Sequence, residues 1–178
     1  ERMRHYLEEF VDGFEPPEGR DEFIRRVHAG KTEHYGRLLE TGEIPLRTGV
    51  ARLIREAHQS GLKLAIASTT TLENAITLLA LNLGAECPGW FDVFACGDVV
   101  QKKKPAPDIY EYALERLGLS AQECLVIEDS RNGLEAADAA GMRCLVTVSG
   151  YTRNEDFSEA ALVVTCLGDP GGEQAEVL

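Results

Sequence analysis

The sequence has no concentration of positive charge. Its 178 residues contain 18 Lys and Arg against 30 Asp and Glu, giving a net charge of −12. Apart from the run Lys102-Lys103-Lys104, the basic residues are scattered along the chain. Nucleic acids and anionic membranes attract proteins through a basic surface that releases counterions. We therefore expect neither as a partner, and an anionic substrate would need a local positive pocket.

Long apolar runs and paired cysteines are also missing. No stretch approaches the roughly 18 apolar residues of a membrane span, and no signal or transit segment is recognisable. The five cysteines are an odd number without Cys-x-x-Cys spacing. They are therefore interpreted as buried thiols, which favours a reducing compartment.

Three common functional motifs are absent from the sequence. It contains no Gly-x-Ser-x-Gly elbow, no Gly-x-x-x-x-Gly-Lys loop and no Gly-x-Gly-x-x-Gly turn. Serine hydrolase, P-loop and dinucleotide-binding functions therefore lack support. The four histidines lie in helical segments without metal-ligand spacing, so packing or surface roles are favoured for most of them.

Hydrophobic periodicity divides the chain near Pro45. Residues 1–45 predict helices over 2–10 and 22–39 and no strand. Residues 46–178 alternate helices with short apolar strands, which predicts an α/β domain whose parallel sheet is covered on both faces. The tail from Gly168 is expected to be mobile. The expected helices are 50–59, 72–83, 107–117 and 133–140, and the expected strands are 63–67, 93–95, 124–127, 143–148 and 161–164.

Polar side chains follow two of the expected strands. Ser68 and the threonines after it lie between a strand and a helix, where hydroxyls and backbone amides can hold an anion. Glu128 and Asp129 end the apolar run that precedes them, and Lys104 precedes another expected helix. The carboxyl ends of parallel strands share one edge, where such folds bind ligands. Mg²⁺ prefers oxygen ligands, and a lysine beside it helps to neutralise phosphate, so these groups predict a metal-assisted phosphoryl-transfer site.

Each of these groups also has an ordinary structural explanation. The hydroxyl run over 68–71 could be an ordinary N-cap, Asp129 could cap the helix that follows it, and Glu128 could be a simple edge residue. A run of lysines is usually a solvated face. Their occurrence together at the carboxyl ends of one parallel sheet favours the functional interpretation.

The order of three segments resembles the haloacid dehalogenase-like phosphatases. These segments are Ser68 after a strand, the stretch from Lys104-Pro105 to Tyr110, and Glu-Asp-Ser-x-x-Gly-Leu-x-Ala-Ala-x-x-Ala-Gly over residues 128–141. Other segments, including Gly97-Asp98-Val99-Val100, are similar to the CbbY branch and especially its chloroplast form. That branch dephosphorylates xylulose 1,5-bisphosphate, an inhibitor of Rubisco. The resemblance implies a Rossmann-like core over 46–178 and a helical cap. Residues 1–45 would form most of that cap.

The resemblance also implies a role for each candidate residue. Asp129 would bind Mg²⁺ directly, with Glu128 as a further ligand or as a support for the ligands. Lys104 would bridge the nucleophile and the transferring phosphoryl group. The phosphoryl oxygens would be held by Ser68, Thr69 and Thr70.

A small phosphorylated sugar is the implied substrate. Arg2, Lys31 and His34 are candidate contacts for its distal phosphate. The implied location is the chloroplast stroma, with the cytoplasm as the alternative. A β-phosphoglucomutase-like activity and a catalytically dead relative that serves as an assembly subunit are the alternative functions.

The sequence departs from the family at one motif. The family's nucleophile and general acid/base lie in an Asp-x-Asp motif on the first strand, and these 178 residues contain no such motif. Asp12-Gly13 follows a helical segment, so we reject it as a substitute. We expect the first strand to be missing, which would leave its neighbours with unpaired edges and an open apolar seam. A longer natural chain, a complementing N-terminal segment or a larger assembly would supply it, and the chain alone is expected to be inactive.

Overall fold

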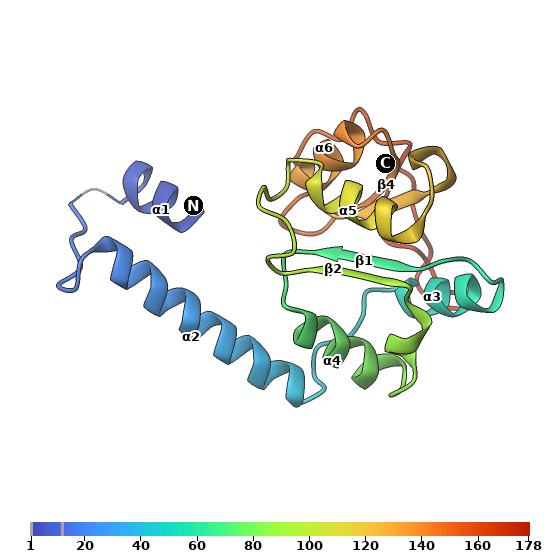
Figure 1. Ribbon diagram of the computed structural model, residues 1–178, viewed down its shortest axis with the longest axis horizontal. Helices are drawn as coiled ribbons and strands as arrows, with labels where there is room; N and C mark the ends of the chain where they lie inside the picture. Colours follow the sequence, from blue (N-terminus) through green and yellow to red (C-terminus); the bar gives the residue numbers. More distant parts are fainter. Residues whose placement is uncertain (1, 12) are drawn as a thin grey trace. The chain divides into compact units, whose positions relative to one another are not determined.

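The computed structural model describes residues 2–11 and 13–178, which fall into two compact units, Glu1–Ile44 and Pro45–Leu178 (Figure 1). Asp12 and the side chains of Arg2 and His5 lie outside this description. The helices of the first unit are α1 (Arg2–Glu9) and α2 (Arg20–Glu40), and those of the second are α3 (Val50–Gln59), α4 (Leu72–Leu83), α5 (Asp108–Leu117) and α6 (Arg131–Ala139), with 3-10 turns η1 (Cys87–Trp90) and η2 (Ala121–Glu123).

The first unit contains two helices and, in its described part, no strand. Phe14 and Phe23 pack edge to face with ring centroids 5.1 Å apart, and Leu39 near the end of α2 is buried. Asp21 and Glu22 in the first turn of α2 favour a helix start there, because negative charge stabilises a helix N-terminus. Whether this unit acts as a cap stays a prediction. None of the described helices combines the length and apolar character needed to cross a membrane.

The strands of the second unit form two parallel sheets. β1 (Ala65–Ser68) pairs with β2 (Val93–Cys96), and β3 (Leu125–Glu128), β4 (Arg143–Thr147) and β5 (Leu162–Val164) form the other sheet in that order. The prediction of a parallel α/β fold is confirmed. Among the described residues no ladder joins β1 to β3.

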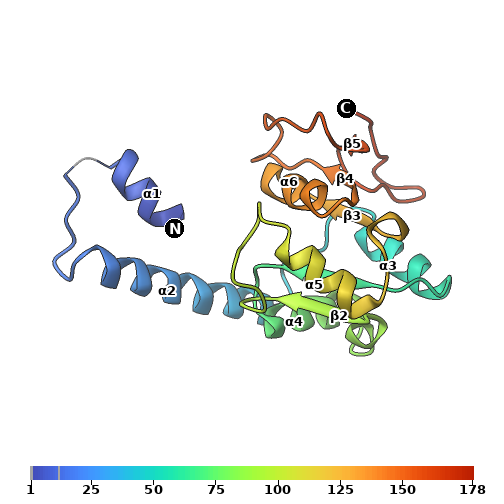
Figure 2. The same ribbon diagram turned by 45° about the horizontal axis from the view of Figure 1, so that its top comes forward.

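Helices cover both faces of the β1–β2 pair, with α4 on one face and α5 on the other (Figure 1). Side chains on a strand point alternately to opposite faces. Ala65 and Ala67 therefore pack in the core that contains α5, whereas Ile66 packs with the cluster that includes Leu79 and Leu83 of α4. The second sheet is packed against α6, which contacts β3 and β4 (Figure 2). This layering leaves the carboxyl ends of the strands for a site.

The free edge of β3 is partly apolar. Val126 is buried, but Leu125 and Ile127 on either side of it are 57% and 41% exposed. β3 pairs only with β4 in the described part of the chain. This edge agrees with the open seam that the sequence predicts between the neighbours of a missing strand.

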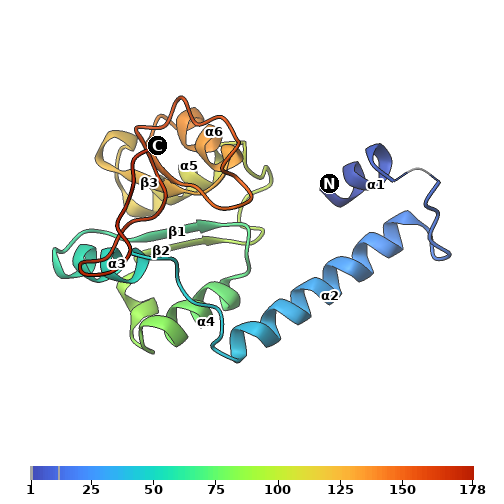
Figure 3. The same cartoon turned by 180° about the vertical axis from the view of Figure 1, so that it is seen from behind.

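The C-terminal tail is ordered, so the prediction of a mobile tail is wrong. Val177 forms an antiparallel bridge with Val164 of β5, and the Thr165 amide donates to the Glu176 carbonyl at 3.0 Å. The segment before the tail lies beside α3 (Figure 3), where Arg52 donates to the carbonyl of Leu167 at 2.9 Å. Glycine-rich composition suggested mobility, but these backbone hydrogen bonds order the segment.

Candidate active site

Three segments that are distant in sequence meet at the carboxyl ends of β1 and β3. Lys104, in the loop between β2 and α5, donates from Nζ to the Ala67 carbonyl of β1 at 3.0 Å. The same ammonium donates to Oε1 of Glu128, the last residue of β3. Ser68 is the last residue of β1 and pairs in register with Cys96. The structure thus brings the lysine, the serine strand and the first of the two acids to one place, and their catalytic roles stay predictions.

Lys104 and Glu128 form a buried ion pair. Their side chains are only 13% and 10% exposed. Taking two charges out of water costs free energy, which their attraction and further hydrogen bonds must offset. The further partners are the Ala67 carbonyl and the ring of Tyr110, whose centroid lies 4.7 Å from Nζ. Removing either charge would leave the other buried and uncompensated.

Tyr110 is a contact of this pair that the sequence analysis did not single out. Its hydroxyl donates to the same Glu128 oxygen as Lys104 does. Burial first, and then the neighbouring Glu128 carboxylate, raise the pKa of Tyr110 well above its ordinary value. The hydroxyl therefore stays protonated and acts as a donor. The position of this tyrosine, in the first turn of the helix that follows the Lys-Pro segment, could have indicated its contact with the ion pair.

Gly133 in the first turn of α6 provides the space for the Glu128 carboxylate. A Cβ atom at this position would lie 2.0 Å from Oε2 and 2.2 Å from Cδ of Glu128. Thr147 of β4 donates from Oγ1 to the Glu128 carbonyl at 3.4 Å. Backbone and carboxylate of Glu128 are therefore both held by neighbouring elements.

Helix caps are formed by residues other than the candidate site residues. The N-cap of α6 is Ser130, whose Oγ accepts the Gly133 amide at 3.3 Å. The N-cap of α4 is Thr71, whose Oγ1 accepts the Asn74 amide at 3.3 Å. The explanation of Asp129 as a cap is therefore wrong, whereas the polar run over 68–71 does supply an ordinary cap, through Thr71.

Ser68 precedes the cap Thr71 by three residues, and Asp129 directly precedes the cap Ser130. Ser68 Oγ accepts the amide of Thr70 at 3.2 Å, while Thr69 is exposed. The exposed Asp129 directly follows β3, and its amide donates to Oε2 of Glu128 at 3.4 Å. The Ser68 hydroxyl, the N-terminus of α4 and the Asp129 carboxylate therefore all lie at or just after the ends of strands in the same unit.

The lysine run is not a uniform solvated face. Lys103 donates from Nζ to the carbonyls of Gly97 and Val100 at 2.8 and 3.0 Å, and pairs with Asp98 at 2.8 Å. It therefore holds together the loop that follows β2. The side chain of Lys104 is largely buried in the site, and Lys102 is exposed.

The carboxylates partly match a magnesium site. No group of three or more potential metal-ligating His, Cys, Asp or Glu side chains occurs among the described residues. Glu128 and Asp129 do supply adjacent carboxylates at a strand end. Mg²⁺ is usually bound through one or two carboxylates together with substrate phosphate and water, so this pair fits that kind of site.

The predicted sugar contacts all belong to the first unit. Lys31 and His34 are exposed on α2, where a spacing of three residues puts them on the same side of the helix. The side chain of Arg2 lies outside the described residues. Their predicted role in binding a distal phosphate stays a prediction.

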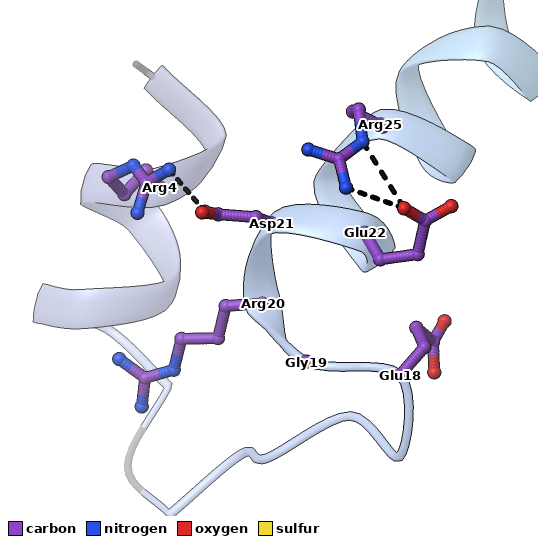
Figure 4. Close-up of a pocket in the computed structure, with 7 residues that line it drawn as sticks. All are labelled: Arg4, Glu18, Gly19, Arg20, Asp21, Glu22 and Arg25. Carbon is purple, nitrogen blue, oxygen red and sulfur yellow. Dashed lines mark hydrogen bonds and ion pairs between the residues drawn. The ribbon is translucent and has the colours of Figure 1, made fainter.

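The first unit has a pocket of its own that the sequence did not predict (Figure 4). Its volume is about 540 Å³, and Arg4 pairs with Asp21 at its wall. Arg25 pairs with Glu22 at 2.5 Å. The lining mixes both charges, so it is not a simple anion site. The lining residues are Arg4, Glu18, Gly19, Arg20, Asp21, Glu22 and Arg25.

Comparison with known protein families matches residues 3–141 to the haloacid dehalogenase-like hydrolases. The chain belongs to this family. Among haloacid dehalogenase-like relatives, the plasmid-encoded CbbY of Cupriavidus necator is 48% identical over 174 residues, which are 96% of this chain and 67% of that protein. A CBBY-like protein of Arabidopsis thaliana is 46% identical over 158 residues, 89% of this chain and 49% of that protein. The family resemblance inferred from the sequence is confirmed.

A solved structure of the same branch has the same fold. It is a mutant CbbY from Rhodobacter sphaeroides in complex with xylulose 1,5-bisphosphate, with a TM-score of 0.83 and 41% identity. The match covers 97% of this chain and 74% of that chain. The present chain spans about half to two thirds of the length of the curated relatives described above.

Proposed function

We propose that the protein containing this chain is a Mg²⁺-dependent sugar-phosphate phosphatase whose substrate is xylulose 1,5-bisphosphate. The observation that carries this proposal is the convergence of Lys104, the end of β1 and Glu128 at the carboxyl ends of the strands. The sugar bisphosphate bound by the related CbbY supports the choice of substrate. The nucleophile would be an aspartate of an Asp-x-Asp segment outside these residues, so the chain by itself is expected to be inactive.

The residues at the site suit the binding of a phosphoryl group. The Lys104 ammonium would stabilise the negative charge that develops on the phosphoryl oxygens during transfer. The Ser68 hydroxyl and the amide of Thr69 would donate to the same oxygens, beside Thr70, whose amide donates to Ser68 Oγ. Asp129 would hold Mg²⁺, with Glu128 as a further ligand or as a support for the ligands, and the metal supplies further charge neutralisation when bound.

Replacing Lys104 tests the proposal directly. Lys104→Met in the protein that carries the nucleophile segment should lower turnover of xylulose 1,5-bisphosphate by about a hundred- to a thousand-fold, the usual effect of losing one such donor. Phosphate release at saturating Mg²⁺ measures this. Lys102→Met is the matched control, because Lys102 is exposed. Lys103 is unsuitable as a control because it holds the loop after β2.

Three other outcomes would count against the proposal or favour one of its alternatives. Equal, modest losses in Lys104→Met and Lys102→Met would reject the assignment of Lys104. A folded wild-type protein that carries the Asp-x-Asp segment and releases no phosphate would point to the catalytically dead assembly subunit. Conversion of β-glucose 1-phosphate to glucose 6-phosphate would instead identify the mutase.

A further inference from the structure

We propose that Tyr110 and Gly133 are positioning residues, which fix the carboxylate of Glu128 and through it the ammonium of Lys104. The proposal rests on the phosphatase function proposed above. Neither residue is placed to touch the phosphoryl group: Tyr110 is buried in α5, and Gly133 is buried in α6. Both act through the two oxygens of a single carboxylate.

One oxygen of Glu128 accepts two hydrogen bonds. Tyr110 and Lys104 both donate to Oε1, and the Lys104 ammonium also lies over the ring of Tyr110. Lysine has a flexible four-carbon stem, so an ammonium at its end is not fixed unless its surroundings fix it. A donor that is already in place costs no reorganisation when charge develops. Tyr110 therefore contributes to catalysis by limiting where the carboxylate, and so the ammonium, can lie.

The other oxygen of Glu128 lies against Gly133. The backbone of Gly133 is helical, so the glycine is not needed for a left-handed conformation. The need is for space, because a Cβ atom would overlap Oε2 and Cδ. The overlapping atoms are the end of a flexible side chain, so Gly133→Ala can be accommodated by moving the carboxylate away from Tyr110 and Lys104.

The first test compares two tyrosines on one helix. Tyr110→Phe keeps the ring below Lys104 and removes only the hydroxyl. It should lower kcat about tenfold, as expected for the loss of one charge-assisted hydrogen bond, while KM changes by less than about twofold. Tyr112→Phe is the matched control, because Tyr112 lies two residues further along α5 with its ring below Arg116. Its kcat should equal that of the wild type.

A double-mutant cycle separates positioning from general support of the fold. In a Glu128→Gln background, Tyr110→Phe should lower kcat by less than about twofold, because the group that it positions is already altered. Independent, multiplying losses of kcat would overturn the proposal.

Gly133→Ala should also lower kcat with little change in KM, whereas Gly30→Ala, at an open position inside α2, should raise the melting temperature and leave kcat unchanged.

The same cycle measured by urea unfolding needs no enzymatic activity. Tyr110→Phe and Glu128→Gln should shift the unfolding midpoint of this chain non-additively, since the two side chains are in contact. Additive shifts would overturn the positioning proposal whatever the activity. Non-additive shifts, together with no phosphate release by the protein that carries the Asp-x-Asp segment, would support the contact and reject the proposed function instead.

Discussion

At the scale of single residues, Asp129 differs from its neighbour Glu128 in exposure and in partners. Asp129 is exposed and Ser130, not Asp129, caps α6. Asp129→Asn should therefore weaken Mg²⁺ binding, by removing one negative charge from the cation site, and leave the helix intact. Titration calorimetry with Mg²⁺ on the protein that carries the Asp-x-Asp segment measures this.

Ser130→Ala provides the opposite pattern as a control. It should lower the free energy of unfolding by about 1 kcal/mol through loss of the cap and leave Mg²⁺ affinity nearly unchanged. An Asp129→Asn variant with wild-type Mg²⁺ affinity would contradict the assignment of Asp129 as a metal ligand.

The buried thiol of Cys144 makes stability depend on alkaline pH. Burial first, and then the nearby Glu128 carboxylate, raise the pKa of Cys144 from an ordinary value of 9.0 to about 12. Above pH 9 the unfolded chain releases this proton and the folded chain retains it, so the stability linked to Cys144 is full below pH 9 and is lost as pH rises towards 12. Urea unfolding midpoints between pH 8 and pH 11 measure the loss.

Cys144→Ala is the variant that isolates this effect. Cys87, Cys96 and Cys124 also have pKa values raised mainly by burial, so the variant should retain part of the alkaline loss. A variant that loses as much stability as the wild type over this range would show that Cys144 does not contribute.

The sequence predicts which segments meet at the strand ends better than it predicts their further contacts. Lys104 and Glu128 could be placed together because strand ends of a parallel sheet share one edge. Tyr110 and Gly133 were missed as contacts of Glu128. Which residues of α5 and α6 face this carboxylate depends on how the two helices pack, and the sequence does not give that packing. The anchoring role of Lys103 was missed for the same reason, since its partners are backbone carbonyls of a loop.

At the scale of helices and strands, order and type are predictable and boundaries are not. The strand expected over 124–127 is β3, Leu125–Glu128, because pairing with β4 extends to Glu128 and Val146. The helix expected from 133 begins at Arg131, since Ser130 is the residue that caps it. The division of the sheet into two pieces follows from pairing across the chain, and only the family resemblance anticipated it.

Arg47 connects the start of the second unit to two strands. Its guanidinium donates to the carbonyls of Thr147, Val148 and Thr165 at 2.9, 2.5 and 3.1 Å, and to Thr147 Oγ1 at 2.9 Å. Arg47→Ala should lower the free energy of unfolding by about 2 kcal/mol, because several acceptors lose a charged donor.

Urea denaturation of Arg47→Ala and Arg55→Ala tests this role. Arg55 is exposed on α3, so its replacement should change stability by less than about 0.5 kcal/mol. Similar losses in the two variants would mean that the hydrogen bonds of Arg47 add nothing measurable to stability.

At the scale of the whole molecule, the two units differ in what they contribute to the proposed function. The second unit, Pro45–Leu178, carries the ion pair, the serine strand and the acidic pair. The first unit carries Lys31, His34 and the mixed-charge pocket. Under the proposed function, phosphoryl chemistry would therefore belong to the second unit, and any choice among sugar phosphates by these residues would belong to the first.

The free edge of β3 also affects how the chain behaves at high concentration. An uncovered strand edge presents unpaired amides and carbonyls to other molecules, and here Leu125 and Ile127 add exposed apolar surface. Light scattering of this chain should therefore rise with concentration, and Ile127→Lys should reduce the rise, since a charge on an edge strand opposes pairing. Leu81→Lys on helix α4, at a position of similar exposure, should not. Equal scattering from both variants would contradict edge pairing. Any segment that paired with this edge would therefore also raise the solubility of the chain.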